Sequence, residues 1–337
     1  MVSRVQRAWS FPHGLWALAP EAVDLLDRTN AWAWRAVPPP LLELLRLRIA
    51  ALIGHDDGLR RRVIVPGSDG PTEAKIARLD RYYEKDAFAP AERDCIEFVE
   101  QFVLDASGPM SGYLARLEGH FPDGVRGFVT AVYVVEFTQR LEMVSAALLG
   151  GTVQAPARWP LVGEPAVAEA APELQQSLRD YQRAVMRGSA LDPVLTELVR
   201  LRCARTHNCR ICQTLRLADA RVAGADDAMT AKIDFYETSD LDERAKMALR
   251  ITDAMITAPT ALTDAVIAQA RALFAPPELA ELCLDITKWS TQKIHVALGT
   301  DGAEALPMNA DGMSFLSFAA DGRPADFSAT LAPESSQ

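Results

Sequence analysis

Two cysteines three positions apart are the residues of this chain best suited to covalent chemistry. Cys209 and Cys212 lie in the stretch NCRICQTLR, where Asn208 can cap a helix that begins at Cys209. Backbone N–H groups at a helix start stabilise a thiolate and lower its pKa, most strongly in a CxxC pair. Arg216 follows Cys212 by four residues, so on a continuing helix its guanidinium shares the face of Cys212 and favours the thiolate. The spacing predicts a redox-active thiol pair.

Two further side chains could move protons beside these thiols. Glu197 stands twelve residues before Cys209 on the preceding predicted helix, from which it could face the cysteines and pair with Arg216. His207 precedes the first cysteine by two residues, and is either a second base or a plain loop residue.

Two other interpretations of the cysteines need no thiol chemistry. A zinc site requires four ligands, or three and a water, but His207 is the one other nearby candidate and the chain has no second CxxC. We therefore expect no metal. Alternatively, both cysteines are small apolar residues of a packed helix, which is how we interpret the three isolated cysteines, Cys95, Cys203 and Cys283.

Composition narrows the class of protein. The 337 residues are 49% hydrophobic and 24% charged, as in soluble globular proteins with a sizeable core. A net charge of −10 argues against nucleic acid and against anionic membrane surfaces as partners. No apolar run reaches the ~18 residues of a membrane span, and the N-terminus does not have the pattern of a signal peptide. Five cysteines in a chain of this length are too few, and odd in number, for the disulfide framework of a secreted protein, so we expect a cytoplasmic protein.

The sequence repeats itself at an offset within a few residues of about 154. The segment LLELLRLRIAAL near the start corresponds to LTELVRLRCA, EAKIARLDRYYE to TAKIDFYET, and FTQRLEMV to STQKIHVA. We assign residues 1–152 to a first copy without the CxxC, 153–170 to a linker, 171–304 to a second copy with Glu197 and the CxxC, and 305–337 to a tail.

The apolar spacing within each copy is helical. Residues recur at i, i+3, i+4 and i+7, and prolines precede or begin several predicted helices. A strand is expected only in MSFLSF, near the end, and the tail should wrap the surface or be partly disordered. We therefore predict an all-α fold of two tandem helical bundles related by a pseudo-twofold, with the pocket between them as the default site.

The stretch from Glu197 to Gly224 resembles the carboxymuconolactone decarboxylase / alkylhydroperoxidase D-like family. The signature of its peroxidase branch is a glutamate, a CxxC twelve residues later, a histidine four residues after the second cysteine, and a helix closed by glycine. Glu197, the two cysteines and Gly224 match, but Arg216 stands at the histidine position. Arginine stays protonated near neutral pH, so it cannot relay a proton, although it can hold a thiolate or an oxyanion.

The resemblance implies an oligomeric all-α bundle, here as two subunits fused in one chain. It implies that Cys212 attacks a peroxide, that Cys209 resolves the disulfide and that Glu197 is the base. Electrons would come from an external thiol or a dihydrolipoyl-type partner, and no bound metal, flavin or haem is implied. Its other branch implies a cofactor-free lyase, decarboxylase or isomerase of a small organic acid or lactone, with Arg216 as carboxylate clamp and Glu197 or His207 moving the proton. A ligand-binding or scaffold protein with a decayed site is the third possibility.

The first copy keeps part of the pattern. Glu43 and Arg62 correspond to Glu197 and Arg216, while His55 and Gly58 stand at the two cysteine positions. We interpret Glu43 and Arg62 as a structural ion pair, and the first copy as a non-catalytic partner that shapes the pocket. The remaining candidates line the pocket between the copies or belong to its edge or core: Gln139, Arg140, Gln292, Lys293, Trp32, Trp34 and Trp289.

Overall fold

The computed structural model describes residues 11–65, 68–84, 86–121, 124–150, 158–160, 170–302 and 306–331. Most of these residues are helical, which confirms the all-α prediction. Most of the linker, predicted at 153–170, lies outside the described residues. Among the described helices none is long and apolar enough to cross a membrane.

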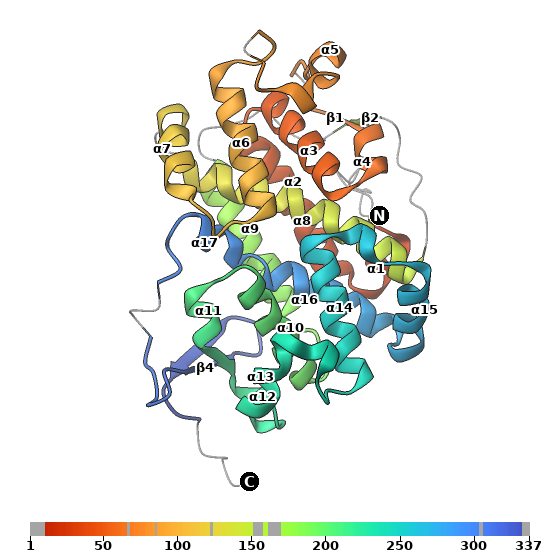
Figure 1. The fold of residues 1–337 in the computed structure, drawn as a ribbon, viewed down its shortest axis with the longest axis vertical. Helices are drawn as coiled ribbons and strands as arrows, with labels where there is room; N and C mark the ends of the chain where they lie inside the picture. The colour runs from red at the N-terminus through yellow and green to blue at the C-terminus, as the bar shows by residue number, and fades with distance from the viewer. Residues whose placement is uncertain are drawn as a thin grey trace, which may run out of the picture.

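Helices α3, α5, α6 and α7 lie at one end of the molecule and α10 to α14 toward the other, while α9 of the second half packs against α2 and α8 of the first (Figure 1). The first half has α1 His13–Leu18, α2 Pro20–Ala36, α3 Pro39–Ile53, α4 Asp56–Arg60, α5 Glu73–Ile76, η1 Leu79–Arg81, α6 Pro90–Leu104, α7 Met110–His120 and α8 Val125–Leu149. The second half has α9 Ala170–Val185, α10 Pro193–Thr206, α11 Arg210–Thr214, α12 Ala218–Val222, α13 Asp227–Ala231, η2 Lys232–Thr238, α14 Glu243–Thr257, η3 Pro259–Ala261, α15 Asp264–Leu273, α16 Pro276–Trp289 and α17 Gln292–Ala297.

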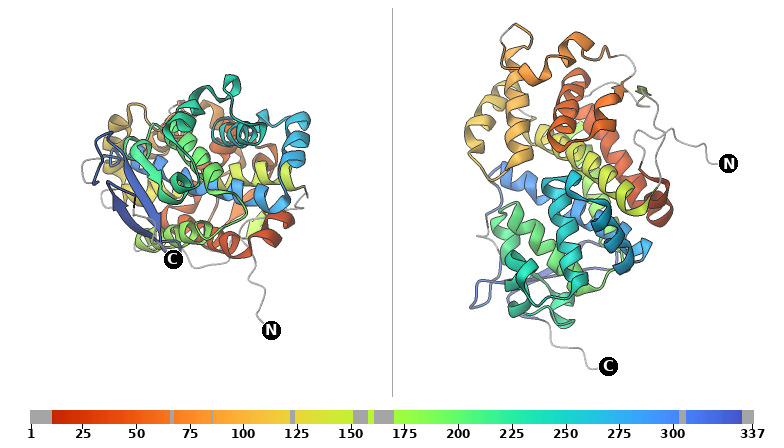
Figure 2. Two further views of the ribbon diagram at one scale, coloured as in Figure 1. Left: turned by 90° about the horizontal axis from the view of Figure 1, so that it is seen from below. Right: turned by 45° about the vertical axis from the view of Figure 1, so that its right-hand side comes forward.

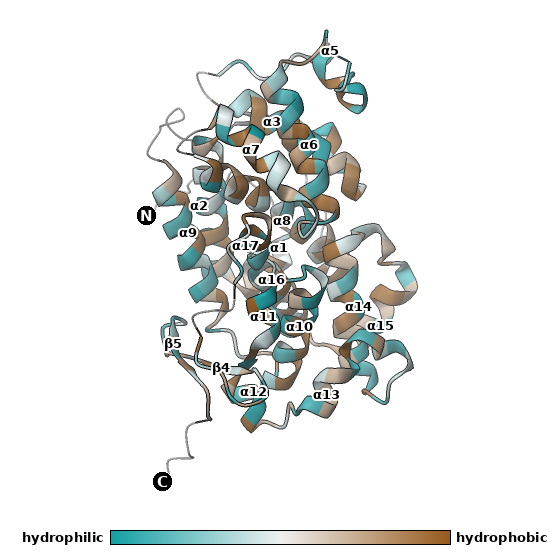
Figure 3. Ribbon diagram, turned by 60° about the vertical axis from the view of Figure 1, so that its left-hand side comes forward, coloured by the Kyte–Doolittle hydropathy of each residue, from teal (hydrophilic) through white to brown (hydrophobic). Residues whose placement is uncertain are grey.

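Helix starts follow the sequence signals. Proline is the first residue of α2, α3, α6, α10 and α16, where its missing N–H would have no helical partner. Apolar and polar residues mix along the outer helices, as expected for amphipathic elements that bury one face (Figure 3). Helix α8 is buried over most of its length and packs against α2, α3, α9 and α16.

Corresponding elements recur at the offset of the sequence repeat. Helices α3 and α10 begin at residues 39 and 193, α4 and α11 at 56 and 210, and α7 and α15 at 110 and 264. The long α8 has a broken counterpart, because the second half ends α16 at Trp289 and resumes helix only at Gln292. The recurrence supports the duplication, while the domain limits and the pseudo-twofold stay predictions.

The described residues also contain five short strands: β1 Arg62–Ile64, β2 Arg158–Pro160, β3 Leu215–Leu217, β4 Ser314–Phe318 and β5 Pro324–Ser328. β1 pairs with β2 in parallel. β4 pairs in parallel with β3, and β5 runs antiparallel to β4. The strand expected in MSFLSF is thus β4, and the described part of the tail forms a hairpin beside β3 at one side of the molecule (Figure 2).

Candidate functional site

The CxxC lies at the start of α11, just after the end of α10. The chain leaves α10 through His207, and Asn208 takes a positive φ of 52°. Cys209, not Asn208, is the N-cap of α11, and its sulfur accepts the backbone N–H of Cys212 at 3.4 Å. Our prediction that Asn208 caps a helix beginning at Cys209 is therefore wrong by one residue, because Asn208 supplies the left-handed turn between the helices.

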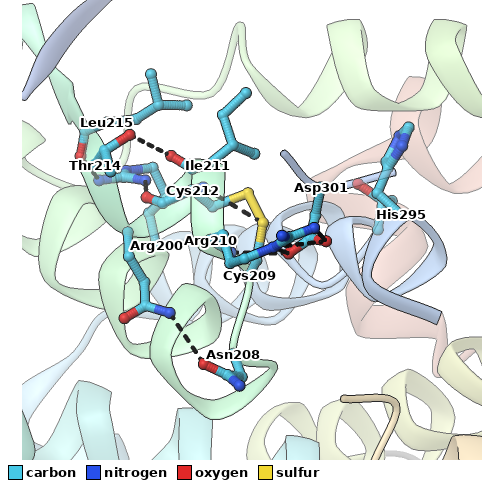
Figure 4. Close-up of a disulfide and its surroundings, with 12 residues drawn as sticks. Arg200, Asn208, Cys209, Arg210, Ile211, Cys212, Thr214, Leu215, His295 and Asp301 are labelled. Carbon is cyan, nitrogen blue, oxygen red and sulfur yellow. Dashed lines mark hydrogen bonds and ion pairs between the residues drawn. A yellow bond between two sulfur atoms is a disulfide. The ribbon is translucent and has the colours of Figure 1, made fainter. Parts of the chain in front are cut away.

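Cys209 and Cys212 are joined as a disulfide with their Cα atoms 5.3 Å apart (Figure 4). Cys209 is fully buried, whereas Cys212 is half-buried. The other three cysteines are free and buried, and burial raises the pKa of each thiol to about 12. Cys212 is therefore the sulfur that a reagent from solvent reaches first.

Arg216 does not share a helical face with Cys212. Helix α11 ends at Thr214, Leu215 is extended, and Arg216 lies in β3 opposite Phe315. Its Nη1 donates to the carbonyl oxygens of Gln213 and Leu215, each at 2.8 Å. Burial and the nearby Arg200 lower the pKa of Arg216 from its usual value. The predicted proximity of Arg216 to Cys212 is wrong, because residues four apart share a face only on a continuous helix and α11 ends between them.

Glu197 pairs with Arg200 rather than with Arg216. Its two carboxylate oxygens accept Arg200 Nε at 2.6 Å and Nη2 at 2.9 Å, and both side chains are 1% exposed. Arg200 also donates to the carbonyl oxygens of Cys212 at 2.9 Å and Leu215 at 2.6 Å. Glu197 thus holds the buried Arg200 guanidinium in place, and this guanidinium binds the following segment of the chain at Cys212 and at Leu215.

The same device recurs in the first half. Glu43 binds Arg46 at 2.7 and 2.8 Å, and Arg46 donates to the carbonyl oxygens of Gly58 and Arg61. Arg62, which we expected to pair with Glu43, binds the exposed Glu73 instead. Glu43 therefore does form a buried ion pair, but with Arg46 instead of Arg62.

The sequence analysis missed Arg46 and Arg200 as the partners of the two glutamates. The sequence does contain a signal for them, because ELLRLR and ELVRLR place an arginine three residues after the glutamate in both copies.

His207 is buried and faces the other half of the molecule. Its ring lies edge-on to Phe137 at 6.2 Å between centroids, and its Nε2 has no hydrogen-bond partner among the described residues. Burial, with Lys293 and Arg140 nearby, lowers the pKa of His207 well below its usual value. Among the described residues no hydrogen bond joins the His207 ring Nε2 to either cysteine, so its role as a second base is not supported by its hydrogen bonding.

Arg140 of α8 and Lys293 of α17, the basic members of the two glutamine–basic pairs, meet at Glu136 in this interior. Lys293 Nζ lies 2.8 Å from both oxygens of Glu136, which also accepts Arg140 Nε at 2.8 Å. All three side chains are buried. They form an ionic cluster between the halves rather than the lining of the two cavities described for this molecule. Of the tryptophans, Trp34 belongs to the core, while Trp32 and Trp289 are half-buried beside it.

Asp301 is a neighbour of the CxxC that the sequence did not reveal. Asp301 is 4% exposed, accepts the backbone N–H of Arg210 at 2.9 Å and pairs with the Arg210 guanidinium. Although burial opposes it, this bonding lowers the pKa of Asp301. His295 of α17 lies beyond Asp301 from the disulfide (Figure 4), its side chain is exposed, and its Nδ1 lies 3.1 Å from Thr300 Oγ1.

The first half fills the corresponding place with a packed polar network. Arg61 Nη2 lies 3.2 Å from His55 Nε2 and 2.6 Å from Glu142. A Cβ on Gly58 would come within 2.6 Å of His55 Nδ1 and 3.0 Å of Gln139 Oε1. Burial and Arg61 lower the pKa of His55 to about 4. Side chains therefore occupy the positions of the missing thiols.

Comparison with known proteins places the chain in a family. The family model "Carboxymuconolactone decarboxylase family" matches residues 172–273. The "Uncharacterized protein Rv2313c" of Mycobacterium tuberculosis strain ATCC 25618 / H37Rv is 35% identical over 238 residues, 67% of this chain and 81% of that protein. The chain belongs to the carboxymuconolactone decarboxylase family. The "Uncharacterized protein MT2376" of strain CDC 1551 / Oshkosh matches to the same extent.

Family membership suggests an enzyme of the decarboxylase or alkylhydroperoxidase kind. The matched range contains Glu197, Arg200, both cysteines and Arg216, and it excludes the whole first half. No solved structure matches the chain. Among the described residues no group of three or more His, Cys, Asp or Glu side chains is placed to hold a metal ion.

Proposed function

We propose that this carboxymuconolactone decarboxylase family member is a thiol-dependent peroxidase and disulfide oxidoreductase that acts on a hydroperoxide. The single observation that carries the proposal is the asymmetric cysteine pair, a half-buried Cys212 within disulfide reach of a fully buried Cys209. This arrangement suits an attacking sulfur that solvent can reach and a resolving sulfur that solvent cannot.

The reaction starts from the reduced pair. The Cys212 thiolate attacks one peroxide oxygen, the O–O bond breaks, and the leaving alkoxide takes a proton to become an alcohol. Cys212 is then a sulfenic acid. Cys209 loses its thiol proton and attacks the Cys212 sulfur, the S–O bond breaks, and the hydroxide that leaves takes a proton to become water. An external dithiol, as the family resemblance implies, reduces the resulting disulfide by thiol–disulfide exchange.

The surroundings of Cys212 support its thiolate. It lies in the first turn of α11, the end of a helix at which a thiolate is favoured, and Arg200 binds its carbonyl oxygen. Glu197 is a positioning residue, since Arg200 occupies both of its oxygens.

The alternative of a cofactor-free lyase or decarboxylase has one supporting observation. The Arg216 Nε is buried and has no hydrogen-bond partner within the described residues, so a substrate carboxylate could take it. The assignment of Glu197 as acid/base is weaker, because its carboxylate is held in the Arg200 ion pair. Assembly into a homo-oligomer and a cytoplasmic location stay predictions from the sequence.

The test is a count of thiols after peroxide treatment. The protein is reduced, exposed to one equivalent of cumene hydroperoxide or hydrogen peroxide, and its free thiols are counted by mass. We expect rapid loss of two thiols, reversed by dihydrolipoamide, and a stable sulfenic acid in C209S. C212S should lose neither thiol. C203S removes a buried thiol of raised pKa and should behave like the parent chain. Two unreactive thiols in the reduced parent would exclude the peroxidase.

A further inference from the structure

A cavity of about 270 Å³ lies in the second half, between the end of α9, the start of α10, α16 and the C-terminal hairpin. None of the residues that line it belongs to the CxxC or to the Glu197–Arg200 pair. Most of its wall is apolar: Val185, Met186, Leu191, Leu217, Leu316 and Phe318. It can therefore hold a small molecule with an alkyl part.

The ionisable side chains that line the cavity are all acidic. They are Asp219, Glu281 and Asp285, with no Lys, Arg or His in the lining. Glu281 is already engaged, because it accepts the backbone N–H groups of Ala190 at 2.7 Å and Leu191 at 3.2 Å. The electrostatic character of the cavity therefore disfavours an anion and favours a cation.

Asp285 is the acidic group with bonding capacity left. It is 3% exposed, and the hydrogen bond described for its carboxyl comes from Thr196 Oγ1 at 3.5 Å, the upper limit for such a bond. A buried carboxyl with one long bond destabilises the fold unless something else satisfies it. A ligand N–H in the cavity would supply the missing donors.

The groups packed around Asp285 favour its protonated form. Burial and Glu281 raise its pKa to about 8, against the smaller opposing effects of Lys288 and Thr196. Lys288, one turn along α16, does not neutralise it, because burial and Arg200 lower the pKa of Lys288 well below its usual value. The Lys288 Nζ lies over the Trp289 ring, 2.6 Å from its centroid, and is 5.0 Å from the centroid of the Phe318 ring. A bound cation would therefore ionise Asp285 and displace its proton.

We propose that this cavity binds a small organic cation of the primary alkylammonium class. The ammonium group lies on the Asp285 carboxylate near Thr196, and the alkyl chain lies against the apolar walls formed by α9, β3 and β4. The site is independent of the peroxidase proposal, since none of its residues takes part in the thiol reaction.

Calorimetric titration of the full-length chain with n-butylammonium chloride tests the site. At pH 7, in two buffers of different ionisation enthalpy, we expect one bound cation and release of close to one proton. D285N should weaken binding by more than about tenfold, since it removes the buried charge. The matched control D326N changes an exposed carboxylate of β5 and should bind as the parent does. Sodium butyrate should not bind.

A second pair of variants keeps the test decisive if D285N does not fold. Ala320 is an exposed residue at the rim, so A320W obstructs the cavity without altering the core. Ala310 is exposed and does not line the cavity, which makes A310W the matched control. Loss of binding in A320W alone supports the site. Absence of butylammonium binding in the parent, equal binding in all variants, or tighter binding of butyrate would overturn it.

Discussion

Replacing Glu197 with glutamine should destabilise the fold strongly. The Arg200 guanidinium is 1% exposed, and E197Q leaves its charge without a carboxylate while its bonds to the Cys212 and Leu215 carbonyl oxygens remain. Removing one partner of a buried ion pair costs about 3–5 kcal/mol. We expect that loss in the free energy of unfolding, measured by urea denaturation and followed by far-UV circular dichroism.

The first half offers a matched control for this prediction. E43Q breaks the equivalent pair with Arg46, which is equally buried, so its cost should be similar. E73Q breaks the exposed pair with Arg62 and should cost less than about 1 kcal/mol. Under conditions where all variants are folded, E197Q should also slow the peroxide oxidation of Cys212, and E43Q should not.

One result would refute the reasoning. If E197Q loses less than about 1 kcal/mol of stability yet abolishes thiol oxidation, Glu197 acts as a base rather than as the anchor of Arg200. Its removal would then also eliminate a titration from the pH profile of the oxidation rate, whereas a lost anchor lowers the rate at every pH.

Two further predictions concern the network of the first half. The folded-state pKa of His55, about 4, lies below its ordinary 6.5, so its contribution to stability is present above pH 6.5 and is lost as the pH falls toward 4. The parent should therefore lose about 3 kcal/mol more unfolding free energy than H55Q when the pH is lowered from 7 to 4. Urea denaturation of the parent and of H55Q at both pH values measures this difference. G58A should destabilise, because its Cβ meets His55 and Gln139, whereas G112A, in open space on α7, should stabilise by up to about 1 kcal/mol in thermal melts. A stable G58A would show that the network can move.

The sequence predicted the helical class, the thiol pair and the late strand because these depend on local patterns. Apolar spacing of 3.6 residues marks helices wherever it occurs, and a CxxC at a helix start brings its own sulfur atoms together. The offset of about 154 residues came from side-by-side comparison of the two halves, which needs no structure.

The partners of Glu197 and Arg216 could not be chosen from spacing. Arg200 lies three residues after Glu197 in the same helix, and Arg216 nineteen residues after it, so both were available. The choice was made by the end of α11 at Thr214, which turns Arg216 into β3 against the C-terminal hairpin. That pairing joins residues about a hundred positions apart, as does the bond between Arg210 and Asp301, and no local pattern signals either.

The hydroxyl of Tyr133 in α8 donates to the carbonyl oxygen of Thr287 in α16, and the two residues occupy equivalent places in the sequence repeat. In a pair of identical subunits these places would hold the same amino acid, and every substitution there would be made twice. A chain that contains both halves is released from that constraint, so one side can keep a phenol as donor while the other keeps a threonine whose backbone carbonyl oxygen accepts the bond. The same freedom lets one half retain thiols while the other fills their place with histidine and glycine. The two halves of one chain can therefore differ at the residues through which they contact each other, which two identical subunits cannot do.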